Sequence, residues 1–144
     1  MRAALALCAL LLAFSGGSAL AGEKAGDPGT NVEMPFLIAP MCIDGKLTGY
    51  AYISSKVVTS SREASLDVRN KIPFIQDAFV RDVNATPITK ATDPKTVDNA
   101  GLIARLTADV KRIVGAAKIS TVVIIQVQIS ELHPNQALVA APPS

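Results

Sequence analysis

Residues 93–131, DPKTVDNAGLIARLTADVKRIVGAAKISTVVIIQVQISE, decide the fold that this sequence predicts. Apolar residues recur every three or four positions in its first half, as on the buried side of an amphipathic helix. They are Val97, Ile103, Leu106, Val110, Ile113 and Val114. Pro94 suits a first helical turn and Asp93 is a good N-cap, so we expect the helix to begin there. Gly115 is expected to end it in a left-handed conformation.

The second half of this stretch predicts a strand, because residues 118–130 are dense in β-branched side chains. The opposite, even-numbered face is apolar only at Val122 and Ile124 and then becomes polar. Alternation therefore predicts one buried face, formed by the odd-numbered apolar positions. These positions are Ile119, Val123, Ile125, Val127 and Ile129.

The region before it predicts a β-hairpin and a broken helix. Met34–Ile43 is an expected strand, and its two prolines confine it to a sheet edge or a bulge. Asp44-Gly45 matches a type I′ turn and leads into a second expected strand, Lys46–Ser60. A helical segment is then expected to run to Val83, with either a kink at Asn70–Pro73 or two stacked helices that meet there. Residues 84–92 are expected to form a loop. The apolar positions at near-helical spacing in this helix are Leu66, Ile72, Ile75, Phe79 and Val83.

These elements define an α+β fold: a small antiparallel or mixed three-stranded sheet, covered by helices on one face. The expected organisation is a signal peptide at residues 1–21, a flexible linker at 22–33, one domain at 34–133 and a disordered tail at 134–144.

The N-terminal segment predicts export. One basic residue, Arg2, precedes a short apolar core that ends in Ala19-Leu20-Ala21, as in a cleaved secretory signal. The alternative is an uncleaved anchor, with residues 3–21 held in the inner membrane. We therefore expect a periplasmic protein, with membrane contact if the segment is retained.

Charge and cysteine content limit the possible partners. Without residues 1–21 the chain has 13 basic and 12 acidic residues and no basic run, so nucleic acid is not an expected partner. Cys42 is then the only cysteine, which excludes an intramolecular disulfide. We expect its thiol to be buried in a strand, and the alternative is a bridge between two chains.

Candidate chemical groups are few. His133, the only histidine, precedes a proline at the edge of the expected domain, which favours a solvated residue over a catalytic base. Together with Met34, Met41 and Cys42 it supplies ligand types that bind copper, but metal-site spacing is missing. Met41 and Cys42 also point to opposite faces of a strand. We expect no enzyme, no catalytic residue, no cofactor and no metal site; the alternative is a small periplasmic binding or metal-handling module.

Two tyrosines, Tyr50 and Tyr52, share one face of the second strand and form an expected aromatic patch. They either cover the outer sheet face or anchor a protein partner.

The layout resembles the flagellar basal-body-associated FliL family, whose periplasmic domain is similar to the stomatin/prohibitin-type (SPFH) domain. Three segments carry the likeness: Lys71–Val80 (KIPFIQDAFV), similar to the family's proline-then-IRDAL helix, Gly101–Val114, and the apolar strand Val122–Ile129. The likeness covers residues 34–132. The family keeps its N-terminal membrane anchor and has aromatic residues in its closing strand, and this chain differs in both features.

This resemblance implies a non-enzymatic periplasmic protein, acting through homo-oligomerisation and contact with envelope machinery such as the flagellar motor stator. The expected function is therefore a structural or interaction role at the cell envelope.

Overall fold

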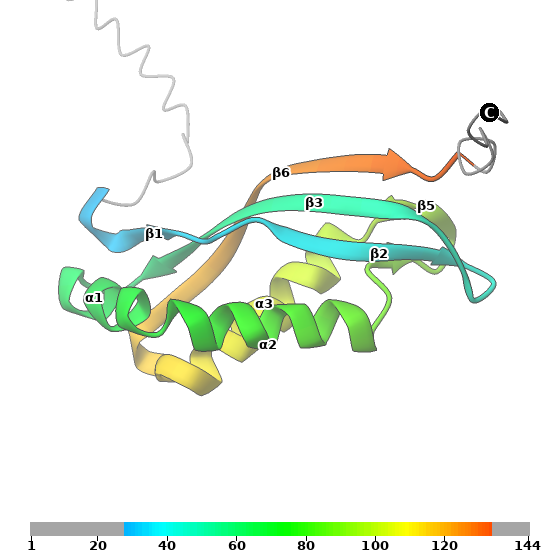
Figure 1. Ribbon diagram of the computed structural model, residues 1–144. Helices are drawn as coiled ribbons and strands as arrows, with labels where there is room; N and C mark the ends of the chain where they lie inside the picture. The colour runs from blue at the N-terminus through cyan, green and yellow to red at the C-terminus, as the bar shows by residue number, and fades with distance from the viewer. Residues whose placement is uncertain (1–27, 134–144) are drawn as a thin grey trace, which may run out of the picture.

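The central element of the structure is the long strand β3 (Lys46–Thr59), and the computed structural model describes residues 28–133 around it. β2 (Leu37–Ile43) and the short β1 (Asn31–Glu33) pair along one side of β3. β6 (Ile119–Glu131) pairs along the other side, and all three pairings are antiparallel. Among the described strands of this sheet, only β3 has neighbours on both sides (Figure 1).

Helices cover one face of this sheet. α1 (Arg62–Asn70) and α2 (Ile72–Ala85) follow β3, and α3 (Asn99–Val114) precedes β6. A separate two-stranded sheet of β4 (Thr89–Lys90) and β5 (Asp93–Val97) connects α2 to α3. In Figure 1, α2 and α3 lie together below the sheet. The predicted α+β class, with helices on one face, is confirmed. The main sheet has four strands where three were expected, because the short β1 adds to it.

The hydrophobic core lies between the two layers. Each fully buried aliphatic or aromatic side chain contributes about 1.5–3 kcal/mol relative to an exposed one. The sheet supplies Leu37, Ala39, Met41, Ala51, Ile53 and Val57, and the helices supply Val68, Ile75, Phe79, Val83, Leu102, Leu106 and Val110.

The predicted break between α1 and α2 is confirmed. Lys71 separates the two helices, and Pro73 lies in the first turn of α2, where its missing N–H removes no helical hydrogen bond. One continuous stripe across the break was nevertheless the wrong expectation, because Leu66 is exposed. α1 buries Ala64 and Val68 instead, since the break gives each helix its own rotation about its axis.

The predicted hairpin is confirmed. Asp44 has φ 51° and Gly45 has φ 75°, the positive values that a type I′ turn requires. β2 is an edge strand, as Pro40 predicts, and it begins at Leu37, after Pro35. Residues 31–33, however, form β1 rather than part of a linker, and Val32 is buried. β3 extends beyond β2, and β1 pairs with this extension at Lys56–Val58.

α3 begins later than the sequence predicts. Its N-cap is Asp98, whose Oδ1 accepts a hydrogen bond from the Gly101 N–H at 3.1 Å. Asp93 instead begins β5, where its carboxylate accepts hydrogen bonds from the Lys95 N–H and the Thr96 hydroxyl. Both aspartates have the side chain of a good N-cap, but Asp93 belongs to β5 and pairs with β4, so Asp98 caps the helix. The expected loop at residues 84–92 likewise contains the last residues of α2 and the strand β4.

The connection from α3 to β6 turns at Gly115. Its φ of 124° is positive as predicted, but its ψ of 132° lies outside the left-handed helical region, so the expected left-handed cap is wrong. A short 3₁₀ turn, Ala116–Lys118, follows. The Lys118 Nζ then donates to the Asp67 carboxylate of α1 at 2.5 Å, which ties the start of β6 to the helical layer.

The capping assignment predicts unequal effects for two aspartates. Asp98→Ala should lower the free energy of unfolding by about 1 kcal/mol, within the usual 0.5–2 kcal/mol for a lost N-cap. Asp93→Ala, the matched control, should lower it less, because its carboxylate orders only the local turn of β5. Urea denaturation of both variants measures the difference, and a larger loss for Asp93→Ala would contradict the assignment.

The Asp67–Lys118 ion pair predicts a pH-dependent stability. Hydrogen bonding and the charge of Lys118 hold the pKa of Asp67 below its ordinary 3.8, and the same contact raises the pKa of Lys118 above 10.5. The pair therefore stabilises the fold between these values. This stabilisation is lost as the pH falls through the lowered pKa of Asp67, or rises through the raised pKa of Lys118.

Asp67→Asn should accordingly be less stable than the unaltered chain near neutral pH, with the difference closing below about pH 4. Urea titrations at several pH values measure it. An equal difference at about pH 3 and about pH 7 would show that Asp67 acts through something other than its charge.

Candidate protein-interaction surface

β6 changes its buried face twice because it contains two β-bulges. The register with β3 skips one residue at Ser120 and another at Ile125. Val122 faces the helices opposite Val57, and after the second bulge Val127 and Ile129 face them opposite Ile53 and Ala51. The inward residues are therefore Ile119, Val122, Ile124, Val127 and Ile129. The prediction of an unbroken buried face at the odd-numbered positions is wrong at Val123 and Ile125, which face outward, and at Ile129, which faces inward but is exposed.

The first half of β6 is covered by α3. The Val122 N–H points away from β3 and donates to Thr107 Oγ1 on α3 at 2.9 Å. Ile119 and Val122 are buried beneath the helix. This half of the strand is hydrogen-bonded on both edges where α3 crosses it.

The second half of β6 leaves its outer edge unpaired. The Leu132 N–H donates to the Thr48 carbonyl of β3 at 2.8 Å, and successive residues of a strand point to opposite edges. Gln128 therefore also points toward β3, whereas Val127, Ile129 and Glu131 direct their N–H and C=O groups outward. Within residues 28–133, no hydrogen bond reaches these outward groups. Figure 1 shows this half of β6 along the margin of the sheet.

The side chains of this half carry no charge until its last residue, Glu131. No charged residue, proline or glycine occurs between Ile119 and Ser130. Ile125 is 57% exposed and Ile129 is 43% exposed. Proteins usually protect such an edge with charges, prolines or bulges, and here only the bulge at Ile125 is present. We refer to residues 125–131 as the open segment of β6.

An apolar groove of about 570 Å³ adjoins the open segment. It lies on the helix side of the sheet, beyond the ends of the helices, between the β2–β3 hairpin, β5 and the end of β6. Most of its lining is apolar, and Lys46, Lys95 and Glu131 add charged groups to it. The apolar lining residues are Met41, Ile43, Leu47, Pro94, Ile129 and Leu132. The groove extends the exposed apolar surface from the strand edge onto the inner face of the sheet.

Tyr50 and Tyr52 lie on the outer face of the sheet, as predicted. Tyr52 is 39% exposed and pairs in register with Ile38 of β2 and Gln128 of β6. Tyr50 is half-buried beside Pro40. Both rings therefore lie close to β6 without belonging to its edge. Their role as partner anchors stays a prediction.

The candidate copper ligands do not form one site. Met34 aligns with Ser55 and Met41 with Gly49, six residues apart on β3, or about 20 Å. Both methionines are buried in the core, and His133 is exposed. In residues 28–133 there is no cluster of three or more His, Cys, Asp or Glu side chains suited to a metal ion.

Cys42 is exposed, which corrects the expectation of a buried thiol. Adjacent strand residues point to opposite faces, and Met41 occupies the buried position. Burial of Met41 therefore turns Cys42 outward on an edge strand. Met41 and Cys42 point to opposite faces of the strand, as predicted. The expectation that Cys42 is the buried one of the two is wrong.

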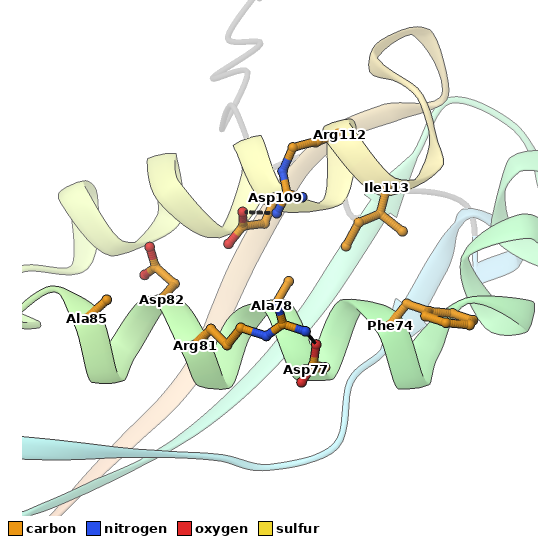
Figure 2. Close-up of a pocket in the computed structure, with 9 residues that line it drawn as sticks. All are labelled: Phe74, Asp77, Ala78, Arg81, Asp82, Ala85, Asp109, Arg112 and Ile113. Atoms are coloured by element: carbon orange, nitrogen blue, oxygen red, sulfur yellow. Dashed lines mark hydrogen bonds and ion pairs between the residues drawn. The ribbon is translucent and has the colours of Figure 1, made fainter.

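A second groove, of about 400 Å³, lies between α2 and α3, and its charged residues are paired (Figure 2). Arg81 pairs with Asp77 within α2, and Arg112 pairs with Asp109 within α3 at 2.8 Å. A further pair joins the helices: Arg105 Nε to Asp82 Oδ2, at 2.9 Å. This groove is neutralised by its own side chains, so the open segment of β6 is the stronger candidate surface.

The pair between α2 and α3 was not predicted. Arg105 and Asp82 are 23 residues apart, and neither stands out in composition or local spacing. The position of Asp82 near the end of α2 does not indicate which residue of another helix it contacts. Only the packing angle of α2 against α3 brings them together.

Comparisons with known proteins do not test the resemblance to the FliL family, which stays a prediction from the sequence. No protein-family model matches the chain, and no curated protein matches it in sequence. Among residues 28–133, none of the helices has both the length and the apolar character that crossing a membrane requires. The residues upstream, which carry the predicted signal or anchor, lie outside the described part, as does the predicted tail at 134–144.

Close packing at Gly49 predicts how the open segment is held to β3. A Cβ at this position would collide with the backbone carbonyl oxygen of Ser130. Gly49→Ala should therefore push β6 outward and destabilise the protein by about 1–3 kcal/mol, as overpacking does. Ser54→Ala, on the outer face of the same strand, is the control and should change stability by less than about 0.5 kcal/mol. Equal stability of the two variants in urea would contradict this packing.

Proposed function

We propose that this chain is an exported protein of the cell envelope that works by binding other proteins, including copies of itself, rather than by catalysis. The observation that carries this proposal is the open segment of β6. Its outward N–H and C=O groups lack partners within residues 28–133, and its side chains carry no charge before Glu131. Strand addition to such an edge is a common mode of protein recognition.

Two neighbouring surfaces support the same role. The apolar groove beside Ile129 and Leu132 provides side-chain pockets next to the strand edge. Tyr52 and Ile38 offer partly exposed apolar surface on the opposite face of the sheet. A partner strand on β6 would lie within reach of both surfaces, because side chains alternate between the two faces of a sheet.

The periplasm is the proposed location, and the basis is the sequence. Arg2, the apolar core and Ala19-Leu20-Ala21 have the plan of a secretory signal. The finer proposal, a FliL-like role near the flagellar motor, rests on the resemblance of Lys71–Val80, Gly101–Val114 and Val122–Ile129. The order of hairpin, helices and closing strand is compatible with it.

Fractionation and affinity purification of the full-length tagged chain test this proposal. We expect the protein in the periplasmic or membrane fraction, as a species larger than a monomer by light scattering, and co-purified with stator proteins. An envelope oligomer without stator proteins would overturn the flagellar role and leave the interaction role. A strictly monomeric chain without an envelope partner would contradict the interaction role as well.

A further inference from the structure

We propose that the open segment of β6 pairs with the same segment of a second copy, antiparallel about a two-fold axis at Gln128. This inference rests on the proposed function, for which it names the surface and the partner. The pairing joins the two sheets into one continuous sheet across the dimer.

The hydrogen-bonding pattern of the edge permits this register. Val127, Ile129 and Glu131 direct their backbone groups outward, so they form the hydrogen-bonded positions of a new ladder. An axis at Gln128 sets Val127 opposite Ile129 of the second copy, and Ile129 opposite its Val127. Each such pair exchanges two N–H···O bonds. Gln128 then lies opposite Gln128 of the second copy, where side chains approach closely.

The side chains also match themselves in this register. Val127 and Ile129 of both copies lie on the inner face and form one apolar row beside the two grooves. Gln128 faces its own copy on the outer face, where the two amides can hydrogen-bond. Glu131 lies near the bulge at Ile125 of the second copy, where β6 carries no charge, so no like charges face each other. Like charges directly opposite would destabilise the pair.

The length of the available edge fits the same axis. With the axis at Gln128, the strand of the second copy extends past the bulge at Ile125 toward Val123. The next residue, Val122, already donates its outward N–H to Thr107 of α3. The pairing therefore ends just before the segment that α3 covers, and the helix does not block it.

A second copy suits this edge better than a charged partner strand. The open segment offers an unpaired edge whose side chains carry no charge before Glu131, and every copy of the chain presents the same uncharged edge. A two-fold contact also pairs the open edges of both copies with each other, so the assembly closes at a dimer. On the opposite side of the sheet, β2 carries Pro40, which cannot donate a hydrogen bond to a further strand, so that edge is less suited to strand addition than β6.

Cysteine cross-linking of the full-length chain tests the register. Both native cysteines, Cys8 and Cys42, are first replaced by serine. Gln128→Cys should then form a disulfide-linked dimer under mild oxidation, because the two introduced thiols face each other across the axis. Gln126→Cys is the matched control: its two copies would be about 13 Å apart along the strands, too far to bridge. We expect at least about tenfold more covalent dimer from Gln128→Cys.

A charge at the edge tests the contact without cross-linking. Ile129→Lys should raise the dimer dissociation constant at least about 100-fold, because it places an ammonium group in the apolar row. Ile38→Lys is the control, since Ile38 is 50% exposed on β2. Circular dichroism and urea denaturation verify that both variants fold, and sedimentation or light scattering measures assembly.

The outcomes separate this inference from the proposed function. If the chain assembles but Gln128→Cys cross-links no better than Gln126→Cys, or Ile129→Lys assembles like Ile38→Lys, the β6 pairing is wrong and the interaction role stands. A strictly monomeric chain overturns the β6 pairing and removes oligomerisation from the proposed function. The full-length chain could also be a monomer that dimerises only when it is truncated after His133. That result would show that residues 134–144 occupy the β6 edge, and it would overturn the second copy as its partner.

Discussion

The pairing of β6 with β3 is the constraint on which the rest of the structure depends. β3 brings β1, β2 and β6 into one sheet, and β6 returns along its length after α3. α3 crosses only the first part of β6, where Thr107 takes up the Val122 N–H. Beyond that crossing the strand continues to Glu131 with one edge bonded to β3 and the other unpaired. The length of the strand relative to its helical cover therefore creates the exposed surface.

The two bulges in β6 decide which side chains this surface presents. Each bulge reverses the alternation, so Ile119 and Val122 enter the core although they differ in parity. After the second bulge the apolar residues Val127 and Ile129 again face the helix side, where Val127 packs against the edge of the core and Ile129 is exposed. A regular strand would have placed Val123 and Ile125 inward and left a different set at the edge.

Elements with a strong local signal were predictable from the sequence. Asp44-Gly45 fixes its turn through positive φ values, and Pro73 fixes the boundary between α1 and α2. The bulge at Ile125 had no such signal, because no glycine or proline marks it and every neighbour favours a strand. The choice between Asp93 and Asp98 as helix cap depended on the β4–β5 pairing, which forms only in three dimensions. The exposure of Cys42 followed from the burial of Met41, a choice between two apolar neighbours.

The candidate site was predictable only in part for the same reason. The sequence identified β6 as an apolar strand and Tyr50 and Tyr52 as outward residues, but it could not reveal how far α3 covers the strand. That coverage depends on the late start of α3 at Asn99 and on the direction in which it crosses the sheet. The alternation of residues along a strand predicts which face is apolar. The open edge of β6 depends instead on how far the helical layer extends over the sheet.

Amide hydrogen exchange at the end of β6, measured at several protein concentrations, tests the central claim most directly. The Gln128, Ser130 and Leu132 amides should be protected at every concentration, because they point toward β3. The Val127, Ile129 and Glu131 amides should exchange fast in dilute protein and slow as concentration rises, because no group within residues 28–133 bonds them and a second copy would. Protection of these three amides that is already complete in dilute protein, or absent at every concentration, would contradict an open edge that a second copy closes.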